Sequence, residues 1–168
     1  MTNQLMQIQY IVHLMLENRS FDHMLGKLYD KSNPPPRNQP FDGLTGKEFN
    51  PLSPSGPPFL VFDISTLPAE QRYCMLGGDP GEGIHNYNNQ LYGKPNPSNR
   101  DKPTNLGFIE NFAAKIRSDQ EKNVPLRPWV KPTNIMGYYT PSLLPILSTL
   151  ASAYAVCDRW FCSIPGHT

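Results

Sequence analysis

The chain has 168 residues, of which 38% are hydrophobic and 11% aromatic, and its net charge at pH 7 is +1. This length suffices for one domain with a buried core, and the composition is too apolar for a disordered chain. The small net charge offers no basic footprint for nucleic acid and no polybasic patch for a membrane surface. The 19 prolines are about twice the average usage, so we expect a globular protein with long, stiff loops.

The first predicted element is an almost continuously apolar run at residues 8–16, broken mainly by Gln9 and His13. A short apolar run of this kind predicts a strand buried on both faces, as in a parallel sheet. A polar cluster at residues 17–23 follows directly. Open α/β sheets bind their ligands at the carboxyl ends of strands, so this cluster is the first candidate site.

The middle of the chain is rich in loop signals. Residues 32–68 carry nine prolines, and because proline removes a donor and fixes φ we expect mostly loop, with one short strand at 59–63. Residues 77–83 are rich in turn formers, and residues 84–92 predict a short helix. Apolar residues at helical spacing, Phe108, Phe112 and Ile116 among them, then predict an amphipathic helix over 107–117.

A further helix and strand are predicted near the end of the chain. After a proline-marked loop at 125–132, Thr140-Pro141 predicts a helix start. The apolar stripe of that helix is expected to comprise Leu143, Leu147, Leu150 and Tyr154. Pro145 cannot donate into the helix, so its first turn is expected to be distorted or separate. Residues 155–158 predict a second buried strand. Strands alternating with helices indicate the α/β fold class.

The cysteines and the start of the chain are the features from which we predict the cellular compartment. Cys74, Cys157 and Cys162 have no zinc-ligand spacing and leave at least one thiol unpaired. Cys157 and Cys162 could form a disulfide, but we favour buried free thiols. The first residues show no basic stretch followed by an apolar one, and no run approaches the ~20 apolar residues of a membrane helix. Taken alone, this chain is expected to be soluble and cytoplasmic.

The polar cluster at residues 17–23 offers two carboxylates, an amide oxygen, a guanidinium and an imidazole. Oxygen ligands at a rigid strand end suit a hard or borderline divalent cation. The alternative is that Asn18, Ser20 and Asp22 only cap the following helix. Capping does not explain Glu17, which directly ends the apolar run.

A second candidate cluster occupies residues 158–168. A hydroxyl residue after a Pro-Gly turn that follows a buried strand is where a nucleophile is often displayed. The alternative is an ordinary exit from a strand into a loop.

These stretches carry a family resemblance that covers essentially the whole chain. The most specific motif is Glu-Asn-Arg-Ser-Phe-Asp-His at 17–23, within the longer similarity of residues 11–26. The other similar stretches are 79–93 with Gly107-Phe108, 136–141 with 144–147, and 155–168. The chain resembles the phosphoesterase family that contains bacterial phosphatidylcholine-type phospholipases C and related acid phosphatases.

The resemblance implies an alkaline-phosphatase-like three-layer α/β/α sandwich with a metal site at the strand ends. Residues 1–168 would be the N-terminal part of a single catalytic domain, truncated after the nucleophile. The family pattern makes Glu17 and Asn18 metal ligands and Thr168 the nucleophile, also in contact with the metal. Many members place a histidine directly after the Asp-Pro-Gly turn, where this chain has Glu82. The nearest histidine, His85, is a candidate for phosphate binding, or else an ordinary surface histidine of a helix.

The activity implied by the resemblance is hydrolysis of phosphoric esters. We expect phospholipase C-type cleavage of a phospholipid headgroup by a threonine that a divalent metal ion activates. The alternatives are phosphomonoester hydrolysis, as in acid phosphatases, and a non-catalytic remnant. The resemblance implies that the family continues for a few hundred residues beyond the threonine, with further aspartate ligands and with histidines. This chain alone is therefore expected to be nearly inactive until that C-terminal portion completes the site.

Overall fold

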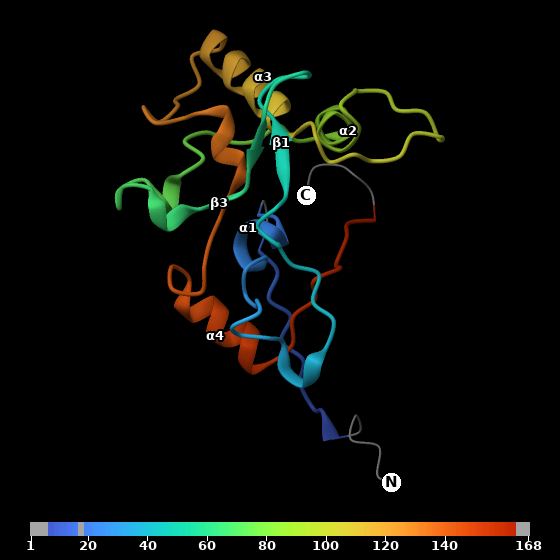
Figure 1. Ribbon diagram of the computed structural model, residues 1–168, viewed down its shortest axis with the longest axis vertical. Coiled ribbons are helices and arrows are strands. Elements are labelled where there is room, and N and C mark those ends of the chain that lie inside the picture. Colours follow the sequence, from blue (N-terminus) through green and yellow to red (C-terminus); the bar gives the residue numbers. More distant parts are fainter. Residues whose placement is uncertain (1–6, 17–18, 164–168) are drawn as a thin grey trace.

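The chain forms helices and short strands in the computed structural model, which describes residues 7–16 and 19–163. The longer elements are α1 (Phe21–Leu25), β1 (Phe49–Pro51), β2 (Pro58–Leu60), β3 (Phe62–Asp63), α2 (Ile84–Tyr92), α3 (Phe108–Glu121), β4 (Gly137–Tyr138) and α4 (Pro145–Ala153). Short 3-10 turns are η2 (Pro36–Asn38), η3 (Ile64–Thr66), η4 (Arg72–Cys74) and η5 (Pro132–Met136). In Figure 1, α2, α3 and β1 lie together at one end, α4 lies at the other, and α1 lies between them.

The described residues form two small sheets. Strands β1 and β2 pair antiparallel, with Asn50 opposite Phe59. Strands β3 and β4 pair in parallel, with Phe62 opposite Gly137. This mixture of helices and small sheets is compatible with an α/β fold. The strand expected at 59–63 is confirmed in part, because that stretch is divided between β2 and β3.

The core forms where α3 and the 3-10 turn η5 pack together. Ile109, Phe112 and Ile116 are buried on one face of α3, which is the periodicity that predicted this helix. A second cluster joins Ile64 and Met75, both almost completely buried. Each fully buried apolar side chain of this size contributes roughly 1.5–3 kcal/mol to folding.

The two central helices agree well with the sequence. Helix α2 covers Ile84–Tyr92, as expected, and ends at Gly93, whose positive φ of 69° suits a residue without a Cβ. Helix α3 begins at Phe108, one residue after the expected start at 107, and continues to Glu121, four residues further than the sequence indicated. Residues 77–83 form no helix or strand, as their turn formers predicted.

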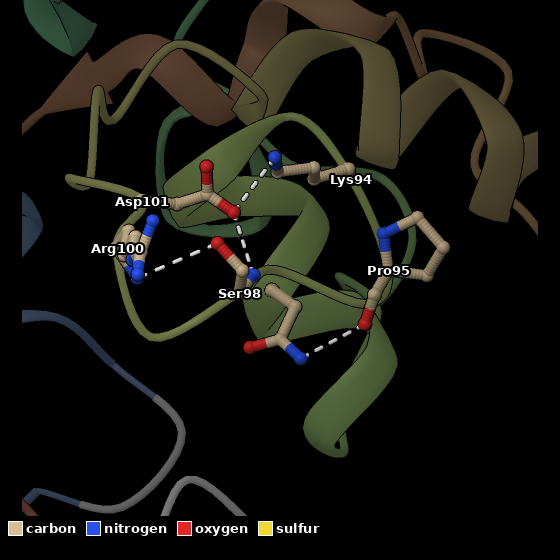
Figure 2. A network of polar contacts seen from close by, with 6 residues as sticks. Lys94, Pro95, Ser98, Arg100 and Asp101 are labelled. Atoms are coloured by element: carbon tan, nitrogen blue, oxygen red, sulfur yellow. Dashed lines mark hydrogen bonds and ion pairs between the residues drawn. The ribbon is translucent and has the colours of Figure 1, made fainter.

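Polar contacts hold the loop that follows α2 (Figure 2). The Lys94 ammonium lies 2.7 Å from Asp101 Oδ2, and the same oxygen accepts a hydrogen bond from the Ser98 backbone N–H at 2.6 Å. The Asn88 side chain donates to Pro95 O at 2.9 Å and so connects α2 to this loop. The contacts of Asp101 with Lys94, and to a smaller extent with Ser98, lower the pKa of the Asp101 carboxyl.

Helix α4 begins at Pro145, whereas the sequence indicated a start at Thr140-Pro141. The residues before it form a separate turn, in which Leu143 N donates to Thr140 O at 3.0 Å, so the expected effect of Pro145 is confirmed. The expected apolar stripe is wrong at its end, because Leu150 is 44% exposed and Tyr154 82% exposed. The buried residues of α4 are instead its small ones, Ser148 and Ala151.

Both expected buried strands are wrong. Residues 8–16 and 155–158 contain no strand, and every one of residues 8–16 is exposed. The most exposed is Val12, at 94%. A strand requires neighbours that accept its backbone hydrogen bonds, and no such neighbour for these segments occurs among residues 7–16 and 19–163.

All three cysteines are free thiols, as expected. The alternative, a Cys157–Cys162 disulfide, is not formed in this structure. Their expected burial is wrong, because all three are exposed. Among the described residues, no helix has the length and apolar character needed to cross a membrane.

Candidate functional site around His23 and the second motif

The expected metal ligands Glu17 and Asn18 and the expected nucleophile Thr168 lie outside the described residues. The structure does describe the remainder of the first motif, residues 19–23, and the start of the second, residues 158–163. The site is therefore built from these flanking residues.

Helix α1 begins at Phe21, three residues after Asn18 in the sequence. Ser20 is its N-cap, and its hydroxyl accepts a hydrogen bond from the His23 backbone N–H at 3.1 Å. The capping interpretation is confirmed for Ser20, while Asp22 lies in the first turn of the helix. Ser20 thus fixes where the chain turns into the helix, two residues after Asn18.

His23 connects the first motif to β4 by two hydrogen bonds. Its ring Nδ1 lies 2.8 Å from Gly137 O, and its backbone carbonyl accepts from Tyr139 N at 2.9 Å. The His23 ring also stands edge-on to the Tyr139 ring, with the centroids 4.9 Å apart. On the other side, a Cβ at position 137 would overlap the Met75 side chain, so glycine leaves room for the packing of Met75 against β4. The sequence placed both segments in the family resemblance but gave no sign that they touch.

The environment of His23 favours the neutral ring. Burial lowers the pKa of His23, the bond to Gly137 opposes that shift, and the positive charge of Arg19 lowers the pKa further. Arg19 Nη1 lies 3.5 Å from His23 Nε2. Backbone carbonyl oxygens only accept hydrogen bonds, so the proton of the neutral ring belongs on Nδ1 and Nε2 has a free lone pair.

An acidic corner lies beside α1. Burial, followed by the charges of Glu48 and Asp42, raises the pKa of Asp22. The Glu48 carboxylate accepts from Thr45 N and Gly46 N, both at 2.9 Å, which fixes the turn that carries it. The two neighbouring negative charges thus disfavour the ionised form of Asp22.

The second motif is anchored to segments far away in sequence. Asp158 Oδ2 accepts from the Asp42 backbone N–H at 2.7 Å, and Arg159 Nε donates to Asp42 Oδ2 at 2.9 Å. The Trp160 ring stands edge-on to the His13 ring, with the centroids 4.9 Å apart. The residues before the first motif and the start of the second motif therefore lie side by side (Figure 1).

His85 lies on α2 and is exposed. Among the described residues it makes no hydrogen bond or ring contact, and nothing described brings it to the Arg19–His23 pair. Two residues further along α2, burial first and then the charges of Glu82 and Cys162 raise the pKa of Tyr87.

An open pocket of about 400 Å³ lies beyond the C-terminal end of α1. It is lined by Lys27, Leu28, Asp30, Asn33, Tyr138, Thr140, Pro141 and Ser142. The Lys27 ammonium donates to Leu44 O at 3.1 Å and lies over the Tyr138 ring. The pocket was not foreseen from the sequence, because its lining combines two segments more than a hundred residues apart.

The expected metal ion fits this chain only in part. The carboxylate of Glu17 and the amide oxygen of Asn18 are suitable donors for a hard divalent cation. Within residues 7–16 and 19–163, however, no group of three His, Cys, Asp or Glu side chains could hold a metal ion. The described part of the chain therefore supplies no complete coordination shell.

The two motifs lie within the stretch of the chain that is similar to known proteins. The model of the phosphoesterase family matches residues 8–168. Non-specific phospholipase C1 of Arabidopsis thaliana is 34% identical over 161 residues, covering 96% of this chain and 26% of that protein. Phospholipase C B of Mycobacterium tuberculosis is 32% identical over 168 residues, covering 98% of this chain and 28% of that protein. Non-hemolytic phospholipase C of Burkholderia pseudomallei is 28% identical over 168 residues, covering 99% of this chain and 20% of that protein.

The relatives come from plants as well as bacteria, so the resemblance is not confined to the bacterial phospholipases C. The chain spans about a quarter of the length of the first relatives, 26% and 28% in the two cases above. The match nevertheless includes both motifs and nearly every residue of this chain. The chain therefore belongs to the phosphoesterase family.

Proposed function

We propose that this chain is the N-terminal part of a phosphoesterase catalytic domain that hydrolyses phosphoric esters, with phospholipase C-type cleavage of a phospholipid headgroup as its main reaction. The observation that carries the proposal is the family match over residues 8–168. The names of the matched relatives, which are phospholipases C, support the choice of substrate class. The proposed fold of the complete domain is the alkaline-phosphatase-like α/β/α sandwich.

In the proposed reaction, the Thr168 hydroxyl oxygen attacks phosphorus and the bond from phosphorus to the leaving alcohol breaks. The alcohol, diacylglycerol in the case of a phospholipid, takes up a proton as it leaves. Water then cleaves the phosphothreonine ester, which releases the phosphorylated headgroup and regenerates the hydroxyl. Such transfers depend mainly on positioning and charge stabilisation.

Glu17 and Asn18 would hold a divalent cation beside Thr168. When bound, such a cation lowers the pKa of a coordinated hydroxyl and stabilises charge on the phosphoryl oxygens. Glu17 would contribute a negative charge, whereas the neutral oxygen of Asn18 would leave a net positive field for the substrate. The remaining ligands are proposed to come from a further polypeptide portion, as the family resemblance implies. Among residues 7–16 and 19–163, no group of three His, Cys, Asp or Glu side chains could hold a metal ion.

The first alternative function is phosphomonoester hydrolysis at the same site, as in acid phosphatases. The second alternative is that the chain is a non-catalytic remnant that folds in part and binds a partner. The gene sequence after codon 168 distinguishes the enzyme from the remnant. An open frame that encodes further aspartate and histidine motifs favours the enzyme, whereas a stop codon favours the remnant.

The enzymatic test uses two substrates with several divalent ions. p-Nitrophenyl phosphorylcholine reports phospholipase C-type cleavage, and p-nitrophenyl phosphate reports phosphomonoesterase activity. We expect the 168-residue chain alone to be nearly inactive on both, and a chain extended by the remaining phosphoesterase portion to prefer the first. Turnover by the short chain at ordinary enzymatic rates, roughly 1–1000 per second, would show that the active site does not need the further portion.

A further inference from the structure

Arg19 directly follows the expected ligand pair, and its side chain is exposed. Within the part of the chain that the structure describes, no carboxylate lies within ion-pair distance of its guanidinium. The described polar contact of this guanidinium is the one to His23 Nε2, at 3.5 Å. Arg19 therefore presents a positive charge to solvent beside the expected metal ligands.

His23 is held in an orientation that suits this contact. Its Nδ1 must donate to Gly137 O, at 2.8 Å, which leaves Nε2 of the neutral ring as an acceptor for an Arg19 N–H. The backbone bond from Tyr139 N to His23 O, at 2.9 Å, prevents the residue from turning away. Gly137, which accepts the bond from the His23 ring, belongs to β4, and β4 is paired with β3. The sheet therefore holds the ring in position, independently of the exposed chain around residue 19.

The chemistry of the exposed guanidinium indicates what it binds. A guanidinium has five N–H donors in a planar fork that matches two oxygens of a phosphate group. One N–H directed to His23 leaves the others available. A neutral acceptor such as this ring fixes the orientation without neutralising the charge, whereas a carboxylate would cancel it.

We infer that Arg19 binds the phosphate group of the substrate and that His23 is a positioning residue that orients the Arg19 guanidinium. This inference rests on the proposed function, since it assigns a phosphate contact within that same site. His23 acts through Arg19 and does not touch the substrate. The sequence singled out both residues, but the proposed metal and nucleophile roles used neither.

The first test measures phosphate binding by the 168-residue chain itself. Inorganic phosphate is titrated while the side-chain N–H signals of the arginines are followed by NMR. We expect a saturable shift at Arg19 that is absent in Arg19→Gln and is unaffected in the control Arg117→Gln, which removes another exposed arginine, on α3. An Arg19 signal that does not respond to phosphate, or responds no more than that of Arg117, overturns the phosphate role.

The second test concerns His23. In His23→Asn, the side-chain amide can still donate to Gly137 O but has no group at the Nε2 position. We expect phosphate affinity at Arg19 to fall about fivefold, which corresponds to about 1 kcal/mol, with the chain still folded. Long-range proton–nitrogen spectra of the parent should show the proton on Nδ1 of His23. A proton on Nε2, or unchanged affinity in His23→Asn, overturns the positioning role.

These outcomes are separable from the proposed function. Phosphate binding that depends on Arg19 and His23 upholds the inference even where an extended chain hydrolyses neither p-nitrophenyl substrate. Conversely, an extended chain that hydrolyses them with kcat and KM unchanged by Arg19→Gln overturns the inference and leaves the proposed function intact.

Discussion

The side-chain oxygen of Asn50 on β1 accepts a hydrogen bond from Phe108 N, the first residue of α3, at 2.8 Å. Its amide nitrogen donates to Phe49 O and to Asn105 O, both at 3.0 Å. Asn50 is only 3% exposed, and the N-cap residue of α3, Gly107, has no side chain of its own to cap the helix. A buried amide from a distant strand thus caps the longest helix.

We expect Asn50→Ala to lower the free energy of unfolding by about 1–3 kcal/mol, because it leaves buried backbone groups without partners. Asn50→Asp keeps the acceptor for Phe108 N but places a buried carboxylate oxygen against Phe49 O and Asn105 O, so it should destabilise the fold as well. The control Asn96→Ala removes an exposed loop amide and should stay within about 0.5 kcal/mol of the parent. Urea unfolding measures all three. Equal stability of Asn50→Ala and the parent would contradict the capping role.

Acidification should destabilise the fold through His23. Its pKa is lowered from the ordinary value of 6.5, so the unfolded chain binds more protons than the folded one near that pH. The stability that depends on the neutral ring is complete above 6.5 and is lost as the pH falls toward the lowered value of the folded state. Thermal unfolding at several pH values checks this.

The matched control for the pH experiment is His23→Asn, which lacks the titrating ring and should lose this pH dependence. The comparison is needed because Asp22 acts in the opposite direction. Its raised pKa means that a charge penalty is relieved as the pH falls toward 3.8. A parent and variant with identical pH profiles between 5 and 8 would contradict the assigned environment of His23.

The exposed apolar residues at 8–16 and near the second motif should make the chain associate. Ile11 is 86% exposed, Val12 94% and Phe161 79%, and apolar patches of this kind favour aggregation. We expect Val12→Lys combined with Phe161→Lys to increase the monomer fraction in analytical ultracentrifugation. The unfolding of the α3 core should not change. A parent chain that is monomeric at high concentration, with a sharp thermal transition, would argue for a self-sufficient domain.

Glu17→Gln should remove bound metal and activity together in an extended enzyme. The change keeps the size of the side chain but removes its charge. Metal content after dialysis, measured together with turnover, tests the ligand role. Parental metal content in a correctly folded variant would show that Glu17 is not a ligand and would favour the interpretation in which the motif only caps α1.

Thr168→Val should lose most turnover in the extended enzyme, whereas Thr168→Ser should keep a measurable part, because only the serine retains a hydroxyl. Acid quenching with labelled substrate should leave phosphate on the peptide that contains Thr168. Ser163, which is exposed, is the alternative acceptor. Label on Ser163, or full activity of the valine variant, would exclude Thr168 as the nucleophile.

Local rules in the sequence determined several elements of this protein. Helix α3 follows from its apolar periodicity, α2 covers the predicted range 84–92, and Pro145 separates the turn before α4. The motif at 17–23, together with the other similar stretches, indicated the phosphoesterase family, which the match over residues 8–168 confirms. These features depend on neighbours within a few residues, so the sequence contains the information directly.

Only the tertiary structure decided which distant groups meet. The bond between His23 and Gly137, the cap of α3 by Asn50 and the tie between Asp42 and Asp158 each join residues that no local pattern relates. The apolar run at 8–16 is a case in which a local pattern gave a wrong prediction. Its composition favours a buried strand, but a strand forms only where other strands accept its hydrogen bonds and cover its faces, and those partners are a property of the whole fold.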